Sequence, residues 1–210
     1  MKTSLYCEQK ELWPKSGQHI LAQYNEHSII VYQAYRPSIA HYAIEHQKFG
    51  GDFKYTRMSW IKPNFLWMMY RSGWATKEGQ EHILAIEIPR SLFDKFLLTA
   101  IASTWNLHQF PTQEKWKAAL SSSEVRLQWD PDHSPNGASL ERRAIQIGLR
   151  GKMLEQFGSK AVISISDITD FVSEQREILL TKPSQLLTPL ERIYHPELSR
   201  SAENVQLNKS

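Results

Sequence analysis

The sequence predicts an α+β fold, a single domain with a mixed, mostly antiparallel sheet and interspersed helices. Runs rich in β-branched and aromatic residues are interrupted by helical patterns, and these runs outnumber what a regular βαβ repeat would give. The chain has 210 residues, which is enough for one hydrophobic core and short for two. We therefore expect an irregular N-terminal segment at 1–27, one α+β domain at 28–195 and a polar C-terminal tail at 196–210.

The first half of the domain begins with a predicted strand over 29–35, where Ile, Val and Tyr predominate. Pro37 is suited to the first turn of a helix, and we expect that helix to end before the glycines at 50–51. A second strand is predicted over 53–60. The helix predicted over 64–72 is apolar on nearly all sides, which indicates that it is mostly buried.

The second half continues with alternating patterns. We expect, in order, strand 82–88, helix 89–101, helix 112–120, strand 125–129, strand 143–149, helix 151–158, strand 161–166 and helix 167–180. Residues 130–137 are dense in Asp, Pro, Ser, Asn and Gly, which predicts a surface loop.

Composition excludes several classes of protein. A single cysteine, Cys7, cannot form an intramolecular disulfide, and the eight histidines lack the spacing of a metal site, so we expect no metal. There is no run of about 18 apolar residues and no secretory leader, so we expect a cytoplasmic protein without membrane contact. The net charge of +3 permits contact with phosphates but is too small for a dedicated DNA binder. Neither a GxGxxG nor a P-loop motif is present.

Tyr32, Tyr35 and Arg36 form a first group of candidate site residues at the end of the first strand. A guanidinium beside aromatic rings and next to a helix N-terminus is suited to hold a phosphate or ribose and to stack on a base. Alternation along a strand places Tyr32, Ala34 and Arg36 on one face. The alternative is that Arg36 pairs with a carboxylate and the tyrosines pack in the core.

Two further strands carry candidates. Ser59 shares a face with Arg57, and its hydroxyl can orient a ribose or an amide, or can be solvated at a sheet edge. Gln146 lies on one strand face between Ala144 and Gly148. The small neighbours leave room for a ligand to approach the backbone, or else for another element that packs closely there.

The segments 31–40, 58–74 and 145–151 resemble family 4291 of the domains of unknown function, over roughly residues 25–195. More distantly, the order of the three groups resembles the ADP-ribosyltransferase superfamily, in which the site surrounds a bound NAD. That resemblance implies NAD as substrate and an ADP-ribosyltransferase-like fold. The catalytic residues would be Gln146, Arg36 and Ser59, and the cofactor-binding residues Tyr32, Tyr35, Arg36, Ser59, Trp60 and Tyr70.

In this resemblance Arg36 would hold the NAD ribose or phosphate, Ser59 would support the nicotinamide pocket and Gln146 would lie beside the nicotinamide ribose. A carboxylate stabilises the positive charge that develops on this ribose far better than a neutral amide does. Glu141 or a group of the substrate would then supply the charge, unless transfer is slow or the domain only binds.

The sequence leaves more than one function open. The leading hypothesis is transfer of ADP-ribose from NAD to a nucleic acid, protein or small nucleotide. The second is a noncatalytic domain that binds a nucleotide-like small molecule or single-stranded nucleic acid through aromatic and basic residues. The third is an interaction protein whose aromatic helix at 64–72 docks a partner through an exposed Trp67.

Overall fold

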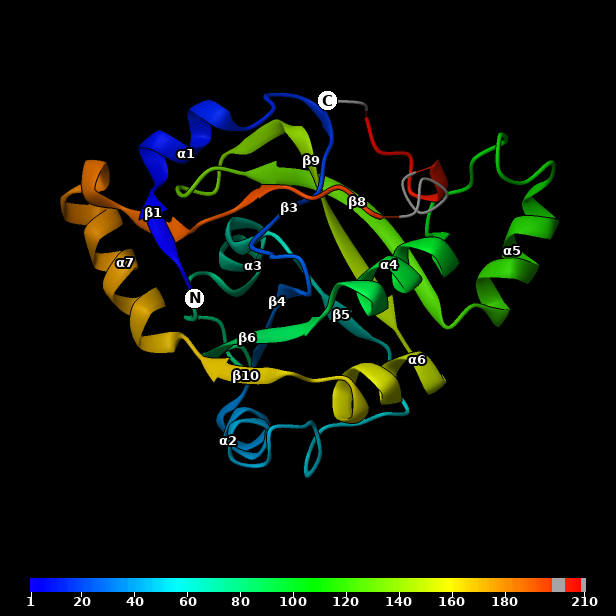
Figure 1. Cartoon of the computed structure of the whole chain (residues 1–210), viewed down its shortest axis with the longest axis horizontal. Coiled ribbons are helices and arrows are strands. Elements are labelled where there is room, and N and C mark those ends of the chain that lie inside the picture. Colours follow the sequence, from blue (N-terminus) through cyan, green and yellow to red (C-terminus); the bar gives the residue numbers. More distant parts are fainter. Residues whose placement is uncertain (198–202, 209–210) are drawn as a thin grey trace.

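The computed structural model describes residues 1–197 and 203–208. It contains two main sheets (Figure 1). They meet where Lys62, directly after a strand of one sheet, pairs with Tyr32 of the other. The strands are β1 (Thr3–Leu5), β2 (Gly17–Gln18), β3 (Leu21–Ala22), β4 (Ser28–Tyr35), β5 (Ser59–Ile61), β6 (His82–Pro89), β7 (Ile101–Ala102), β8 (Val125–His133), β9 (Ser139–Leu149), β10 (Ser164–Asp167), β11 (Leu187–Pro189) and β12 (Arg192–Ile193). The α-helices are α1 (Tyr6–Leu12), α2 (Pro37–His46), α3 (Phe65–Ser72), α4 (Arg90–Thr99), α5 (Gln113–Ser122), α6 (Gly151–Glu155) and α7 (Thr169–Thr181). A π-helical turn at Gln156–Lys160 and a 3-10 turn at Pro183–Gln185 complete them, so the α+β class is confirmed.

The first sheet has the order β10–β6–β4, with both pairs antiparallel. The second has the order β2–β9–β8–β7, and β5 pairs antiparallel with β9. Directly after β5 the chain pairs with β4, where the Lys62 amide donates to the Tyr32 carbonyl at 3.2 Å and the Lys62 carbonyl accepts from the Tyr32 amide at 2.7 Å. The segment at 59–62 therefore joins the two sheets.

Helices cover both faces of the first sheet. Apolar side chains of α2 and α4 share one buried cluster with Ile29, Val31 and Ile86. Apolar side chains of α3 and α7 share the other with Tyr32 and Ile83. Because side chains alternate along β4 and β6, each strand supplies both clusters.

The helix predicted over 64–72 is confirmed, and both of its ends are fixed by specific contacts. The Asn64 side chain accepts from the Trp67 amide at 2.7 Å, and the Glu191 carboxylate accepts from the Phe65 amide at 2.6 Å. Glu191 is buried, and this burial raises its pKa well above the ordinary value. Gly73 ends the helix with a φ of 60°, the left-handed conformation that glycine favours. The last turn of α3, including Arg71, thereby has a defined position.

The N-terminal segment is not irregular as predicted, since β1 pairs with β11 and β3 with β12. Ile20 and Ala22 lie fully buried in the first core cluster. At the other end, Val205 is 1% exposed and its carbonyl accepts from the Trp129 indole at 3.0 Å. The described part of the polar tail therefore packs on the domain, while 198–202 and 209–210 lie outside the described residues. The sequence could not predict the packing of these ends, because it depends on short strands that pair with segments far away in the chain and carry no local pattern.

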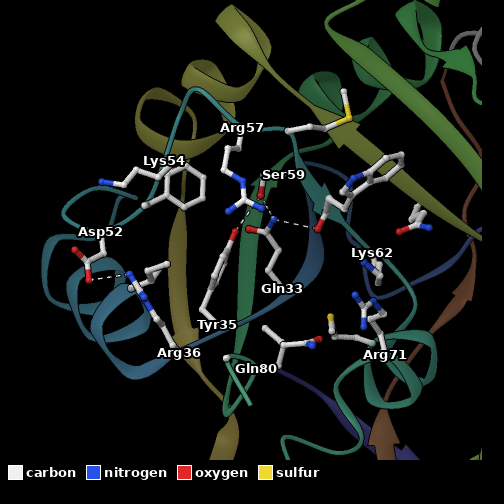
Figure 2. A pocket seen from close by; sticks show the side chains of 18 of the residues that line it. Gln33, Tyr35, Arg36, Asp52, Lys54, Arg57, Ser59, Lys62, Arg71 and Gln80 are labelled. Atoms are coloured by element: carbon white, nitrogen blue, oxygen red, sulfur yellow. Dashed lines mark hydrogen bonds and ion pairs between the residues drawn. The ribbon is translucent and has the colours of Figure 1, made fainter. Parts of the chain in front are cut away.

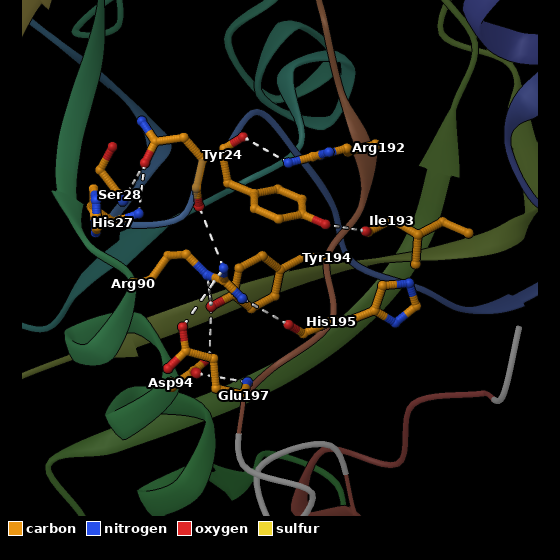
Figure 3. A network of polar contacts seen from close by, with 11 residues as sticks. Tyr24, His27, Ser28, Arg90, Asp94, Arg192, Ile193, Tyr194, His195 and Glu197 are labelled. Atoms are coloured by element: carbon orange, nitrogen blue, oxygen red, sulfur yellow. Dashed lines mark hydrogen bonds and ion pairs between the residues drawn. The ribbon is translucent and has the colours of Figure 1, made fainter.

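A polar network around Arg90 fastens these terminal segments to α4 (Figure 3). The Arg90 guanidinium donates to the carbonyls of Asn25 and His195, at 3.4 and 3.1 Å. It also lies 5.2 Å from the ring centroids of both Tyr24 and Tyr194. Charge, hydrogen bonds and ring contacts thus converge on one side chain.

Two other predicted elements differ from the structure. The strand predicted over 53–60 is limited to Ser59–Ile61, and turns precede it. Of the loop predicted over 130–137, residues 130–133 belong to β8, and a turn follows them before β9. The reason is that Asp132 forms a buried ion pair with Arg142 of β9, at 2.6 Å, which compensates for the turn-forming composition.

In the described part of the chain, no helix combines the length and the apolar character needed to cross a membrane.

Candidate functional site

A cavity of about 790 Å³ lies where the two sheets meet, a volume in the range of small-molecule sites (Figure 2). Its walls come from the end of β4, from β5, from α3 and from the loops at 52–58 and 79–80. The lining residues are Gln33, Ala34, Tyr35, Arg36, Ile39, Asp52, Phe53, Lys54, Arg57, Met58, Ser59, Trp60, Lys62, Met68, Arg71, Gly79, Gln80, Gln128 and Gln146.

The cavity brings together most of the candidate residues. Arg36, Ser59 and Gln146 all line it, although they come from three separate parts of the chain, and so do Tyr35 and Trp60. Long-range pairing brings them together, because β5 pairs with β9 and Lys62, directly after β5, pairs with Tyr32 of β4.

Tyr32 and Tyr70 do not line the cavity. Tyr32 is fully buried on the opposite face of β4, where its ring packs against Phe65 with centroids 5.6 Å apart. Tyr70 is 44% exposed and stacks on His133, with centroids 3.5 Å apart. The prediction placed Tyr32 on the ligand-facing side of β4, whereas Gln33 and Tyr35 occupy that side.

The Ser59 hydroxyl lies at the centre of a small hydrogen-bond network. It accepts from the Gln33 amide nitrogen at 2.7 Å and lies 3.0 Å from the Tyr35 hydroxyl. Gln33 also donates to the Trp60 carbonyl at 3.0 Å, while its own amide oxygen is buried without a partner among the described residues. Burial raises the pKa of Tyr35, so this phenol stays protonated. The network therefore offers neutral polar groups to a ligand.

Arg36 pairs with a carboxylate, which was the alternative to ligand binding. Its guanidinium lies 3.0 Å from Asp52, and both side chains are about half exposed. Such an exposed ion pair contributes little to stability, about 0–1 kcal/mol. Because both residues also line the cavity, a phosphate that enters could take the place of Asp52 on the guanidinium.

Gln146 is held by an aspartate that the sequence analysis did not select. Its amide nitrogen donates to one oxygen of Asp130 at 2.8 Å, and Gln128 donates to the other at 2.7 Å. Gln128 and Gln146 lie opposite each other on β8 and β9. Glu141, suggested as the source of negative charge, is exposed and does not line the cavity. Asp130 is the carboxylate in contact with Gln146.

Gly148 does not provide an open approach for a ligand. A Cβ at this position would meet the Met58 sulfur at 2.7 Å and the Trp60 indole at 3.0 Å. Of the two interpretations of the small residues beside Gln146, close packing of another element is therefore correct for Gly148, because side chains of the segment at 58–60 pack against it. Glycine at 148 lets the Trp60 indole approach the backbone of β9 closely, and Trp60 forms part of the cavity wall.

Lys62 is the most unusual group in the cavity. It is 5% exposed, and its ammonium makes no hydrogen bond or salt bridge with any of the described residues. Burial, together with the nearby positive charge of Arg71, lowers its pKa to about 8, and Asp130 opposes this shift. Buried lysines without a carboxylate partner are costly and are typical of functional sites.

The charge on the cavity wall is strongly unbalanced. The cationic lining residues are Arg36, Lys54, Arg57, Lys62 and Arg71. Among the described residues that line the cavity, Asp52 is the only acidic one. Such an arrangement favours an anionic ligand.

No group of His, Cys, Asp and Glu side chains suited to a metal ion occurs within 1–197 and 203–208.

The docking hypothesis for the helix at 64–72 is wrong. It required an exposed Trp67, but Trp67 is 7% exposed and the apolar residues at 65–69 are all buried. The exposed residue of this helix that faces the cavity is cationic, Arg71.

Sequence reasoning missed Lys62, Arg71, Gln33 and Asp130. One signal was available for Lys62: it precedes Pro63, which favours an extended backbone, within an otherwise apolar segment. The other three carry no local signal, because only tertiary packing places them at the cavity.

Comparison with known proteins gives the family of the chain. Among curated proteins, none matches it. The model of the family DUF4291, described as a domain of unknown function, matches residues 19–194, which is most of the chain. On this match the protein belongs to the DUF4291 family.

Proposed function

We propose that the cavity binds NAD and that the protein transfers ADP-ribose from it to an acceptor. The observation that supports this is the convergence of Arg36, Ser59 and Gln146 on one cavity with an excess of positive charge. NAD carries a diphosphate, which such a wall attracts, and two bases that can stack on Tyr35 or Trp60.

In the proposed reaction, the bond between the nicotinamide nitrogen and the ribose carbon breaks. The bonding electron pair stays with the nitrogen, so nicotinamide leaves as a neutral molecule and positive charge develops on the ribose. A nucleophilic oxygen or nitrogen of the acceptor then bonds to the ribose carbon and loses its proton to solvent.

Asp130 would compensate for the neutral amide of Gln146 in this reaction. Its carboxylate accepts hydrogen bonds from Gln146 and Gln128, so it lies behind the Gln146 amide that would face the ribose. Through this contact, Gln146 would present a polarised amide to the developing positive charge. Asp130 thus acts as a positioning residue in the proposal.

The test is an assay for nicotinamide release with the variants Gln146→Ala, Arg36→Ala and Asp130→Asn. Each should lower release at least tenfold, which corresponds to about 1.4 kcal/mol of transition-state stabilisation. Lys117→Met, in an exposed position on α5, removes a positive charge away from the cavity and should leave release unchanged. Unchanged turnover in both Gln146→Ala and Arg36→Ala, with the variants folded, would disprove the transferase assignment.

Binding without catalysis is the second candidate, and one observation favours it. The residue nearest to the expected ribose position is a neutral glutamine, and the carboxylate behind it is already occupied by two amide donors. A nucleotide or single-stranded nucleic acid would then bind with an affinity that falls steeply with salt. This candidate predicts salt-sensitive binding without release of nicotinamide.

A further inference from the structure

We propose that Lys62 and Arg71 form a binding site for the diphosphate group of a nucleotide, at the junction of the two sheets. This inference deepens the proposed function, because it assigns the part of the cavity that holds the phosphates. It does not depend on whether any bond of the ligand is broken.

The position of Lys62 is the first argument. The residue is held by its backbone, which pairs with Tyr32 of β4 directly after β5 leaves β9. Alternation along this segment places Lys62 on the same side as Trp60, which lies opposite Gly148. The residue lines the cavity although it is only 5% exposed.

The missing partner is the second argument. Lys62 and Arg71 take part in no salt bridge within the described part of the chain, and Figure 2 shows the Arg71 guanidinium directed towards Lys62. Two neighbouring cations repel each other, and burial of one of them adds a cost. A ligand with two negative phosphates removes both penalties at once.

The surrounding charges make this site sensitive to pH. Arg71 from α3 opposes the charged form of Lys62, and Asp130 from β8 favours it. From β4, the Tyr35 phenol lines the cavity and remains neutral because burial raises its pKa. Gln128 and Gln146, on β8 and β9, are neutral. With a pKa of about 8, Lys62 is only partly charged in mildly alkaline solution.

A bound phosphate favours the charged form of Lys62, so binding near pH 8 takes up protons from the buffer. ADP is a suitable probe, because its last phosphate proton dissociates at a pKa of about 6 and does not contribute at pH 8. Calorimetry in two buffers of different ionisation enthalpy measures this uptake.

The experiment compares ADP, inorganic pyrophosphate and adenosine on the full chain. Wild-type protein should bind both ADP and pyrophosphate. With ADP it should take up a fraction of a proton at pH 8 and bind more weakly as the pH rises to 9.5. Both Lys62→Met and Arg71→Met should weaken ADP at least tenfold, and Lys62→Met should abolish proton uptake. Adenosine should bind equally to all variants, because it has no phosphate. Lys117→Met is the control for loss of one positive charge.

Unchanged ADP affinity in both Lys62→Met and Arg71→Met would overturn the inference. Arg71 is exposed, so its variant tests the site even if a change at the buried Lys62 disturbs folding. Tighter binding of ADP than of pyrophosphate identifies a nucleotide site, and equal affinities identify a site for diphosphate alone. If ADP binding depends on Lys62 but no nicotinamide is released from NAD, the transferase proposal fails while this inference stands. If nicotinamide is released from NAD but ADP binding depends on neither Lys62 nor Arg71, this inference fails while the transferase proposal stands.

Discussion

At the scale of single residues, the cavity depends on groups whose burial is energetically unfavourable in the free protein. Lys62 is the clearest case, because it is buried without a carboxylate partner. The amide oxygen of Gln33 is another, since it is also buried without a hydrogen-bond partner among the described residues. Polar groups left unpaired in a cavity are expected where a ligand is to complete the contacts.

The first prediction concerns Lys62→Met and stability. Its pKa is about 8 in the folded chain and 10.5 ordinarily, and this difference corresponds to about 3 kcal/mol that opposes folding. Below pH 8 both states hold the proton and the full cost applies. Between pH 8 and 10.5 the folded state releases the proton first, so the cost falls. Lys62→Met should therefore be more stable than wild type at pH 7, and this advantage should shrink by pH 10.5.

Urea unfolding of both proteins at pH 7 and pH 10 measures this difference, with Lys117→Met as the control for a general change in net charge. Wild-type protein that is as stable as Lys62→Met at pH 7 would show that the lysine is satisfied in the free protein.

These residues also mark the limit of what the sequence could predict. Arg36, Ser59 and Gln146 were found because each lies in or directly after a strand with a recognisable pattern, and the structure does place them around one cavity. Tyr32 was assigned to the wrong face of β4 because the neighbouring helix α3, which buries it, does not influence the strand pattern. Lys62 was missed because its burial results from pairing across two sheets.

At the scale of elements, the join between β5, β9 and β4 shapes the site. The pairing of Trp60 with Gly148 brings an indole onto the backbone of β9, and Lys62 follows two residues later. On β9 the residues that alternate with Gln146, namely Ile145, Ile147 and Leu149, are all buried in one cluster. The sequence did not predict that β5 is only three residues long, because the register of a short strand is set by its partner.

The second prediction is that Gly148→Ala disturbs this join. The new methyl group would lie 2.7 Å from the Met58 sulfur and 3.0 Å from the Trp60 ring, so both side chains must move. We expect a loss of about 1–3 kcal/mol in the free energy of unfolding, the usual cost of overpacking. Ligand affinity should fall as well, because Trp60 and Met58 line the cavity.

The double variant Gly148→Ala with Met58→Ala provides the control. Removing the Met58 side chain makes room, so the cost of the alanine should be smaller in this background. An equal cost in both backgrounds, measured by chemical unfolding, would mean that crowding by Met58 is not its origin.

At the scale of the whole molecule, the chain ends complete the domain. Strands β1 and β3 pair with β11 and β12 near the C-terminus, and Val205 is buried in the main core cluster. The polar composition of both ends resembles that of loops and therefore predicts peripheral segments. Pairing between residues far apart in the sequence, which no local pattern reports, explains the difference.

The third prediction tests this closure with Asn204→Ala. The Asn204 side chain donates to the carbonyls of Leu97 and Ala100, at 2.7 and 3.0 Å, where α4 ends. Its removal leaves these helix-terminal carbonyls without their donor and should cost about 1–2 kcal/mol. Glu203→Ala, at an exposed neighbouring position, is the matched control. Equal thermal midpoints for the two variants would contradict a structural role for this segment.

Thermal unfolding with and without millimolar NAD tests the proposal that the native protein binds NAD in the cavity between the sheets. A ligand that binds only the folded state stabilises it by about 2.7 kcal/mol at a hundredfold excess over the dissociation constant, so the midpoint should rise by several degrees. Nicotinamide alone, which has no phosphate, should have no such effect. An unchanged unfolding midpoint in millimolar NAD would contradict the binding of NAD in this cavity.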